Sequence, residues 1–166
     1  MWQFCRAWQD KVKLRNFFPA QSAASDVLLL RALPGAEEMT DNKNENRGRV
    51  LIVEDEFLIA LDLEAAMSGL GFEICGLAPN GEEARSLAMD QQPDVVLVDV
   101  YLGGAREGIE TARWLRDVCD ASVVFVTAHT DAATVERIKE VVPGSPILSK
   151  PVYREHLAKA VAAVAH

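Results

Sequence analysis

Polar residues that could do chemistry follow four of the apolar runs in this chain, each where the run ends. These residues are Glu54, Asp55, Asp99, Thr127 and Lys150. Close carboxylates repel one another unless a cation lies between them, and carboxylates, a carbonyl and water are ligands that Mg²⁺ prefers. A carboxylate can also accept a phosphoryl group as an acyl phosphate, and hydroxyl and ammonium groups can neutralise the transferred charge. The set predicts a site for Mg²⁺-dependent phosphoryl transfer.

Taken singly, each of these residues has an ordinary structural explanation. An acid such as Asp55 can complement a helix N-terminus, Thr127 suits a strand because it is β-branched, and Lys150 can be a solvated loop cation. Their common position favours a shared site, since the carboxyl ends of all strands in a parallel sheet lie at one edge. The side chains converge there if the strand order is 2-1-3-4-5.

The elements that must position these residues alternate regularly after residue 49. Residues 95–98 are apolar without a polar break, as in a strand buried on both faces of a parallel sheet. Strands are predicted at residues 50–53, 72–78, 94–98, 122–127 and 147–149. Helices are predicted at residues 57–70, after the capping Asn80, and at residues 106–118, 131–142 and 153–165. This alternation predicts an α/β fold, a parallel sheet doubly wound by five helices through right-handed crossovers.

The first predicted helix carries two apolar stripes. One follows the helical period and should face the sheet; its residues are Ile59, Leu63, Ala66, Met67 and Leu70. The second lies on the adjacent face and consists of Leu58, Leu61 and Ala65. This second stripe either packs more deeply in the core or forms an exposed surface that docks a partner helix.

Residues 1–48 differ in composition from residues 49–166. Aromatic and basic residues are interleaved in the first part, Pro19 and Pro34 break any long element, and the stretch after Met39 is polar. We expect a mostly irregular, poorly ordered N-terminal extension and one domain over residues 49–166. The extension could hold a docking helix, but the change in composition favours the alternative that translation starts at Met39.

Charge and cysteine content narrow the class of protein further. The net charge is -8, which disfavours binding to nucleic acid or to an anionic membrane. No apolar run reaches the roughly 18 residues of a membrane span. Cys5, Cys75 and Cys119 show neither metal-ligand spacing nor a disulfide framework, as expected for a protein of the reducing cytoplasm.

Residues 49–166 resemble the receiver domain of two-component response regulators. The resemblance rests on the motifs VLIVEDE, VLVDV, VFVTAH and ILSKPV. It implies a flavodoxin-like fold with strand order 2-1-3-4-5 and makes Asp99 the phosphoacceptor. It further implies that Glu54 and Asp55 hold Mg²⁺, with Asp99 and the backbone carbonyl of Tyr101 as additional ligands.

The resemblance also implies a function. Thr127 would be the switch hydroxyl, Lys150 the cation that contacts the phosphate, and the bond between Lys150 and Pro151 would be cis. The donor would be the phosphohistidine of a histidine kinase or of a histidine phosphotransfer protein. Such a protein catalyses only its own phosphorylation and dephosphorylation. Because no residues follow the last helix for an output domain, we expect a stand-alone receiver that contacts an unknown protein target or passes the phosphoryl group on.

Two positions depart from the pattern of the resembling family. An aromatic residue usually precedes the lysine by three positions, whereas this chain has Ile147, which puts the usual aromatic readout in doubt. The loop after the phosphoacceptor has Gly103-Gly104 in place of a common proline and is one residue longer before Gly108. Tyr101 and His129 each lie two residues beyond a catalytic position, where side chains tune the lifetime of the phosphate in that family.

Three rival interpretations stay open at this point. A haloacid-dehalogenase-like phosphatase also uses an aspartate nucleophile and Mg²⁺, but wants a second aspartate where Tyr101 stands. A nucleotide-binding Rossmann domain is disfavoured because the first turn has acids and no glycine. The third is an unphosphorylated pseudo-receiver that acts as a binding module, against which the complete set of acids, threonine and lysine argues.

Overall fold

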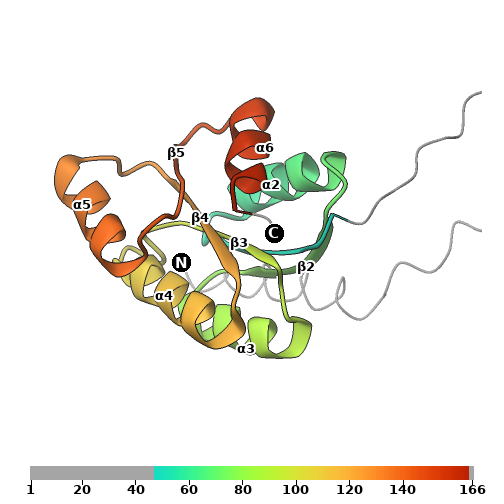
Figure 1. Ribbon diagram of the computed structural model, residues 1–166, viewed down its shortest axis with the longest axis horizontal. Coiled ribbons are helices and arrows are strands. Elements are labelled where there is room, and N and C mark those ends of the chain that lie inside the picture. Colours follow the sequence, from blue (N-terminus) through green and yellow to red (C-terminus); the bar gives the residue numbers. More distant parts are fainter. Residues whose placement is uncertain (1–46, 165–166) are drawn as a thin grey trace, which may run out of the picture. The chain divides into compact units, whose positions relative to one another are not determined.

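Residues 47–164 are described by the computed structural model and form a five-stranded parallel sheet with five helices (Figure 1). The strands are β1 (Arg49–Val53), β2 (Glu73–Ala78), β3 (Val95–Val98), β4 (Ser122–Thr127) and β5 (Ile147–Ser149). The helices are α2 (Phe57–Gly69), α3 (Gly81–Gln91), α4 (Glu107–Cys119), α5 (Ala132–Val141) and α6 (Arg154–Ala162). The strand order is β2-β1-β3-β4-β5, and all neighbouring pairs are parallel. The predicted fold is therefore confirmed, and the predicted element ends lie within one residue of the observed ones except at the end of α6, which comes three residues earlier than predicted.

Helices cover both faces of the sheet. Figure 1 shows α2 and α6 on one side and α3 and α4 on the other, with α5 beside α4. Every residue of β3 is buried, as are the last four residues of β1. This burial explains the unbroken apolar sequences of both strands, because each side chain faces a helix layer. The two central strands therefore hold the residues that directly follow them in fixed positions.

The α2 helix presents a slightly different face to the sheet than its sequence pattern predicts. Its buried residues are Ala60, Leu63 and Met67, which share one face at a helical spacing. Ile59, predicted to face the sheet, is only half-buried. The prediction was wrong there because the helical period alone did not determine which of the neighbouring positions 59 and 60 faces the sheet, and the structure buries Ala60.

The α3 helix begins as its sequence predicts. The side chain of Asn80 accepts a hydrogen bond of 2.9 Å from the backbone N–H of Glu83, which satisfies one free donor of the first turn. A second acceptor comes from α4, where Oε1 of Glu107 lies 3.0 Å from the backbone nitrogen of Gly81. A Cβ at Gly81 would lie only 2.3 Å from this oxygen and from Oγ1 of Thr111, so a larger residue would fit only if these side chains moved.

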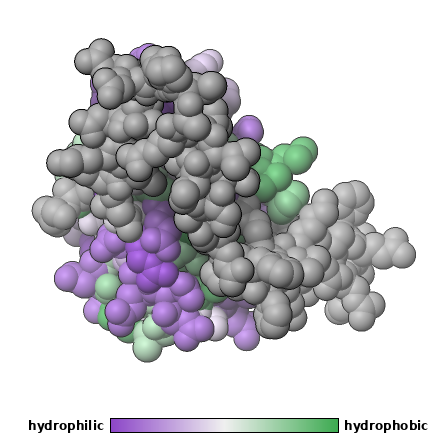
Figure 2. All heavy atoms as spheres, turned by 90° about the vertical axis from the view of Figure 1, so that its right-hand side faces the viewer, coloured by the Kyte–Doolittle hydropathy of each residue, from purple (hydrophilic) through white to green (hydrophobic). Residues whose placement is uncertain are grey.

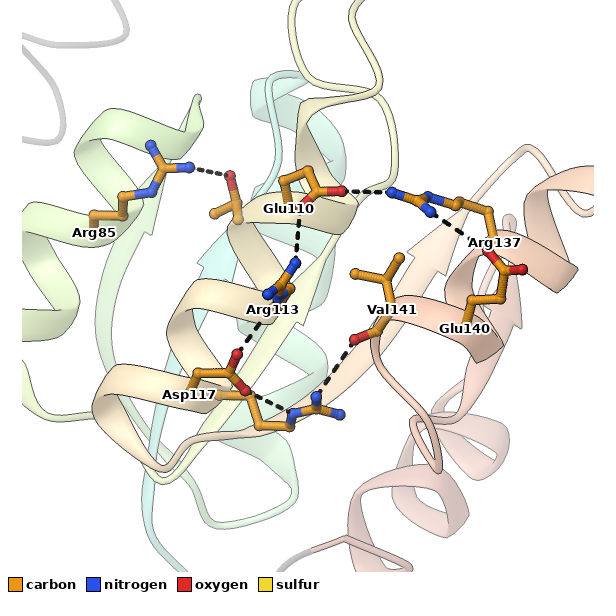
Figure 3. Close-up of polar contacts among 9 residues, drawn as sticks. Arg85, Glu110, Arg113, Asp117, Arg137, Glu140 and Val141 are labelled. Atoms are coloured by element: carbon orange, nitrogen blue, oxygen red, sulfur yellow. Dashed lines mark hydrogen bonds and ion pairs between the residues drawn. The ribbon is translucent and has the colours of Figure 1, made fainter.

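Polar contacts attach α5 to α4 (Figure 3). The guanidinium of Arg137 lies 3.0 Å from Oε1 of Glu110, and Arg116 donates to the carbonyl oxygen of Val141 at 3.4 Å. Arg113 pairs along α4 with Asp117 at 3.5 Å. Exposed ion pairs of this kind contribute little individually, about 0–1 kcal/mol. The apolar contacts of the buried Ile138 therefore carry more of the attachment of α5.

The two described cysteines are free thiols that pack against the same hydrophobic core cluster. Cys75 in β2 and Cys119 at the end of α4 are both half-buried. Burial raises the pKa of the Cys75 thiol to about 11 and also raises the pKa of Cys119. Both thiols therefore stay protonated at neutral pH.

Several predictions concern residues 1–46, which lie outside the described residues. They are the irregular extension, the alternative start at Met39 and the state of Cys5. Among residues 47–164, no helix is long and apolar enough to cross a membrane. Where Figure 2 shows these residues, hydrophilic side chains make up most of the visible surface, in keeping with the acidic composition.

Candidate functional site

Three carboxylates meet at the carboxyl ends of β1 and β3. The backbone N–H of Glu54 donates to Ala78 of β2, and that of Asp99 donates to Val53 of β1, at 2.8 and 3.0 Å. These bonds continue the sheet beyond its formal ends and fix both residues in place. As a result, carboxylate oxygens of Glu54, Asp55 and Asp99 lie within 4.8 Å of one another. Glu54 and Asp99 are buried, whereas Asp55 is exposed.

Lys150 reaches the same place from the end of β5. Its ammonium nitrogen lies 2.5 Å from Oδ2 of Asp99 and 2.7 Å from Oε2 of Glu54. Its backbone N–H donates to the carbonyl oxygen of Thr127 at 2.9 Å, which extends the pairing of β4 with β5. The bond from Lys150 to Pro151 is cis, as the resemblance implied.

Burial and charge act against each other in this cluster. Burial raises the pKa of Glu54 from 4.5 to about 7, although the hydrogen bond and charge of Lys150 oppose the rise. Burial alone would lower the pKa of Lys150, but its contacts with Asp99 and Glu54 outweigh this effect and raise the pKa. One ammonium group therefore only partly compensates the buried acids.

The carboxylate oxygens of the cluster can bind a second cation in addition to the Lys150 ammonium group. Among the described residues, Oε2 of Glu54 is the buried side-chain oxygen that has no partner with hydrogen-bond geometry, although Lys150 lies at ion-pair distance. Three carboxylates so close together are suitable ligands for a hard divalent ion such as Mg²⁺. The donor set thus agrees with the predicted metal ligands Glu54, Asp55 and Asp99.

Thr127, the last residue of β4, and Tyr101, in the loop after β3, border the carboxylates. Thr127 ends β4 and is fully buried, and its hydroxyl oxygen accepts a hydrogen bond of 3.2 Å from the backbone N–H of His129. The backbone N–H of Tyr101 donates to Oδ1 of Asp99 at 3.2 Å. The predicted role of the Tyr101 carbonyl as a metal ligand stays a prediction.

Two glycine positions shape the loop after Asp99. A Cβ at Gly108 would lie 1.7 Å from the carbonyl oxygen of Asp99, so glycine alone lets the start of α4 approach the backbone of the site. The backbone N–H of Gly103 donates to Oδ2 of Asp55 at 3.0 Å and so fixes the exposed acid. The sequence marked this loop as unusual but did not reveal this contact.

Arg106 is a further residue that the sequence did not single out. Its Nε donates to the hydroxyl of Tyr101 at 2.7 Å. The sequence feature that could have indicated this contact is the Gly103-Gly104 pair, because such a pair is typical of a two-residue turn that folds the chain back on itself. Ile147, the other departure, is half-buried, packs against the core and pairs with Phe125 of β4.

Comparison with known proteins identifies the family. Residues 50–162 match the family described as the response regulator receiver domain. The chain belongs to this family. A solved receiver domain of a modulated diguanylate cyclase from Desulfovibrio desulfuricans is 39% identical with a TM-score of 0.66, and the match covers 72% of this chain and 94% of that one. The receiver domain of PhyR from Erythrobacter litoralis is 26% identical with a TM-score of 0.59, over 71% and 90% of the two chains.

Among curated proteins, the similarity is likewise to response regulators. The transcriptional regulatory protein PdtaR of Mycobacterium tuberculosis is 40% identical over 92 residues, which are 55% of this chain and 44% of that protein. The phyllosphere-induced regulator PhyR of Methylorubrum extorquens is 36% identical over 83 residues, 49% and 31% of the two chains. The aligned part thus spans less than half the length of these relatives. Receiver domains are generally not classical enzymes, so this membership removes the phosphatase and Rossmann interpretations.

Proposed function

We propose that this receiver accepts a phosphoryl group on Asp99 from the phosphohistidine of a histidine kinase or of a histidine phosphotransfer protein. The observation that carries the proposal is the contact of Lys150 with both Asp99 and Glu54 beside the exposed Asp55. A pseudo-receiver would need neither the nucleophile nor the paired cation. The protein then works in the cytoplasm and signals by contact with a protein target or by onward transfer, without binding nucleic acid or membrane.

The chemistry follows from the positions of these side chains. A carboxylate oxygen of Asp99 attacks the phosphorus, the bond from phosphorus to the donor imidazole breaks, and its electron pair stays on the imidazole. Lys150, already 2.5 Å from Oδ2, then contacts an oxygen of the transferred group. Thr127 accepts from the His129 N–H, so its own hydroxyl proton can donate to another phosphoryl oxygen.

Glu54, Asp55 and Asp99 would hold Mg²⁺ beside the acceptor. Bound there, the ion would supply positive charge that neutralises phosphoryl oxygens during transfer. The backbone N–H groups of Tyr101 and Gly103 orient the Asp99 and Asp55 carboxylates for both tasks.

Labelling with a small phosphodonor tests the proposal. The protein is incubated with acetyl phosphate and Mg²⁺, and its intact mass is measured before and after treatment with hydroxylamine. We expect the mass of one phosphoryl group to appear and hydroxylamine to remove it, because an acyl phosphate reacts with this nucleophile. An unchanged mass would instead favour the pseudo-receiver.

Mg²⁺ should stabilise the protein against unfolding, and Asp55→Ala should abolish most of this effect. Ligand binding to the folded state adds about 2.7 kcal/mol at a concentration 100 times the dissociation constant. Urea denaturation with and without Mg²⁺ measures the gain. Asp62→Ala, which removes an exposed acid of α2, is the matched control and should keep the full effect. An equal increase in the free energy of unfolding by Mg²⁺ in all three proteins would show that Asp55 is not a metal ligand.

The second stripe of α2 should dock the phosphodonor. The exposure of this stripe supports the docking interpretation, because Leu58 is 76% exposed and Leu61 is only half-buried. Leu58→Ala should slow phosphotransfer from a cognate donor about five- to tenfold, the effect of losing one important apolar interface contact, and leave labelling by acetyl phosphate unchanged. Met89→Ala, at an exposed apolar residue of α3, should alter neither rate. Slower labelling by both donors would contradict a docking role.

A further inference from the structure

The loop that follows the phosphoacceptor contains a tight reverse turn. Leu102 and Ala105 exchange two backbone hydrogen bonds, of 2.9 and 3.1 Å, as an isolated antiparallel bridge. Gly103 and Gly104 between them have φ values of 59° and 83°. Positive φ at both central residues defines the hairpin turn that favours glycine pairs. The turn reverses the chain, so that Arg106 comes back beside Tyr101.

Arg106 makes two kinds of contact with the Tyr101 side chain. Its Nε donates to the phenolic hydroxyl at 2.7 Å, and its guanidinium carbon lies 5.5 Å from the ring centroid. The first contact is directional and the second is an electrostatic attraction to the ring. Together they fix both the position and the tilt of the ring, although Arg106 itself is exposed.

The Tyr101 ring in turn packs against His129. The ring centroids are 4.2 Å apart and the planes are tilted by 42°. The backbone N–H of Tyr101 contacts the Asp99 carboxylate, and that of His129 contacts the Thr127 hydroxyl. The contact between the two rings therefore connects the loop after β3 with the loop after β4, beside Asp99 and Thr127.

We propose that Arg106 is a positioning residue that holds Tyr101 against His129 and thereby slows hydrolysis of the phosphorylated Asp99. This inference rests on the proposed function. In hydrolysis, a water oxygen bonds to phosphorus, the bond from phosphorus to the Asp99 oxygen breaks, and its electron pair returns to the carboxylate, while both protons of the water stay on oxygens of the departing phosphate. Side chains that exclude water from a reactive intermediate suppress this reaction. Arg106 acts through Tyr101 and does not contact the phosphoryl group.

The placement of the ring can be tested without phosphorylation. Because the His129 and Tyr101 ring centroids are only 4.2 Å apart, the ring current of Tyr101 should shift the imidazole proton resonances of His129 in NMR spectra. Arg106→Ala should move these resonances most of the way to their positions in Tyr101→Ala. Arg113→Ala, which removes an exposed arginine from α4, is the matched control and should leave them in place. Unmoved His129 resonances in Arg106→Ala would overturn the inference.

The effect on hydrolysis is tested by a double-mutant cycle. After labelling with acetyl phosphate and removal of the donor, loss of the phosphoryl group is followed by intact mass. Arg106→Ala should accelerate the loss about two- to tenfold, as expected for one exposed hydrogen bond, and Arg113→Ala should not. In the Tyr101→Ala background the same substitution should have no effect, because there is no ring to hold. Equal acceleration in both backgrounds would show that Arg106 acts directly and would overturn the positioning role.

The two proposals fail in distinguishable ways. A wild-type protein that gains no phosphoryl group would overturn the proposed function and, with it, the effect of Arg106 on hydrolysis. The placement of Tyr101 by Arg106 would still stand or fall on the NMR measurement. A labelled wild-type protein with an unchanged rate in Arg106→Ala would overturn the inference alone.

Discussion

Asp99→Asn should abolish phosphorylation of the protein and leave its fold intact. Asparagine has the shape of aspartate, so the backbone hydrogen bond from Asp99 to β1 is kept while the nucleophile and one charge are lost. Intact mass after treatment with acetyl phosphate and Mg²⁺ should show no gain of a phosphoryl group. Asp62→Asn, at an exposed acid of α2, should still gain one.

The same substitution has a consequence for stability. Asp99 is one of three carboxylates within 4.8 Å, and removing one negative charge relieves their repulsion. Lys150 keeps its contact with Glu54 in the variant. We therefore expect the free energy of unfolding in the absence of Mg²⁺ to be unchanged or higher. A variant that still gained a phosphoryl group would show that the acceptor is another residue, and a variant that was unlabelled and also unfolded would show that Asp99 is structural.

The central part of the site could be predicted because it depends on strand ends alone. Glu54 and Asp99 directly follow buried strands, so the parallel sheet leaves them little freedom, and the structure places them together as expected. Lys150 is 51 residues beyond Asp99 in sequence, yet the short β5 determines its position in the same way. An apolar run followed by one polar residue is thus a strong local signal in this fold.

The orientation of α2 and the contact of Arg106 could not be predicted because they depend on tertiary packing. The rotation of α2 that buries Ala60 instead of Ile59 depends on how the whole helix packs on the sheet, and the helical period does not distinguish these neighbouring positions. The contact of Arg106 with Tyr101 depends on positive φ angles at two glycines and on the side-chain conformation that follows. Sequence could mark that loop as unusual, but only coordinates could show which side chain it returns to the site.

Lys150→Ala should destabilise the protein strongly, and more so at high pH. The side chains of Lys150 and Glu54 are 11% and 1% exposed, so the substitution leaves two close carboxylates without their buried cation. Removing one partner from a buried ion pair costs about 3–5 kcal/mol. Urea denaturation at pH 8 in EDTA should show a loss of this size. Lys139→Ala, at an exposed lysine of α5, should change the free energy of unfolding little.

The pH dependence follows from the raised pKa of Glu54. An acid whose pKa is 4.5 when unfolded and about 7 when folded binds its proton more tightly in the native state. Its protonated form therefore stabilises the fold fully below pH 4.5, and this contribution is lost as the pH rises through 7. At pH 5 Glu54 carries a proton, so losing the Lys150 ammonium should cost much less than at pH 8. A destabilisation of equal size at both pH values would show that Lys150 stabilises the fold through packing and not through its charge.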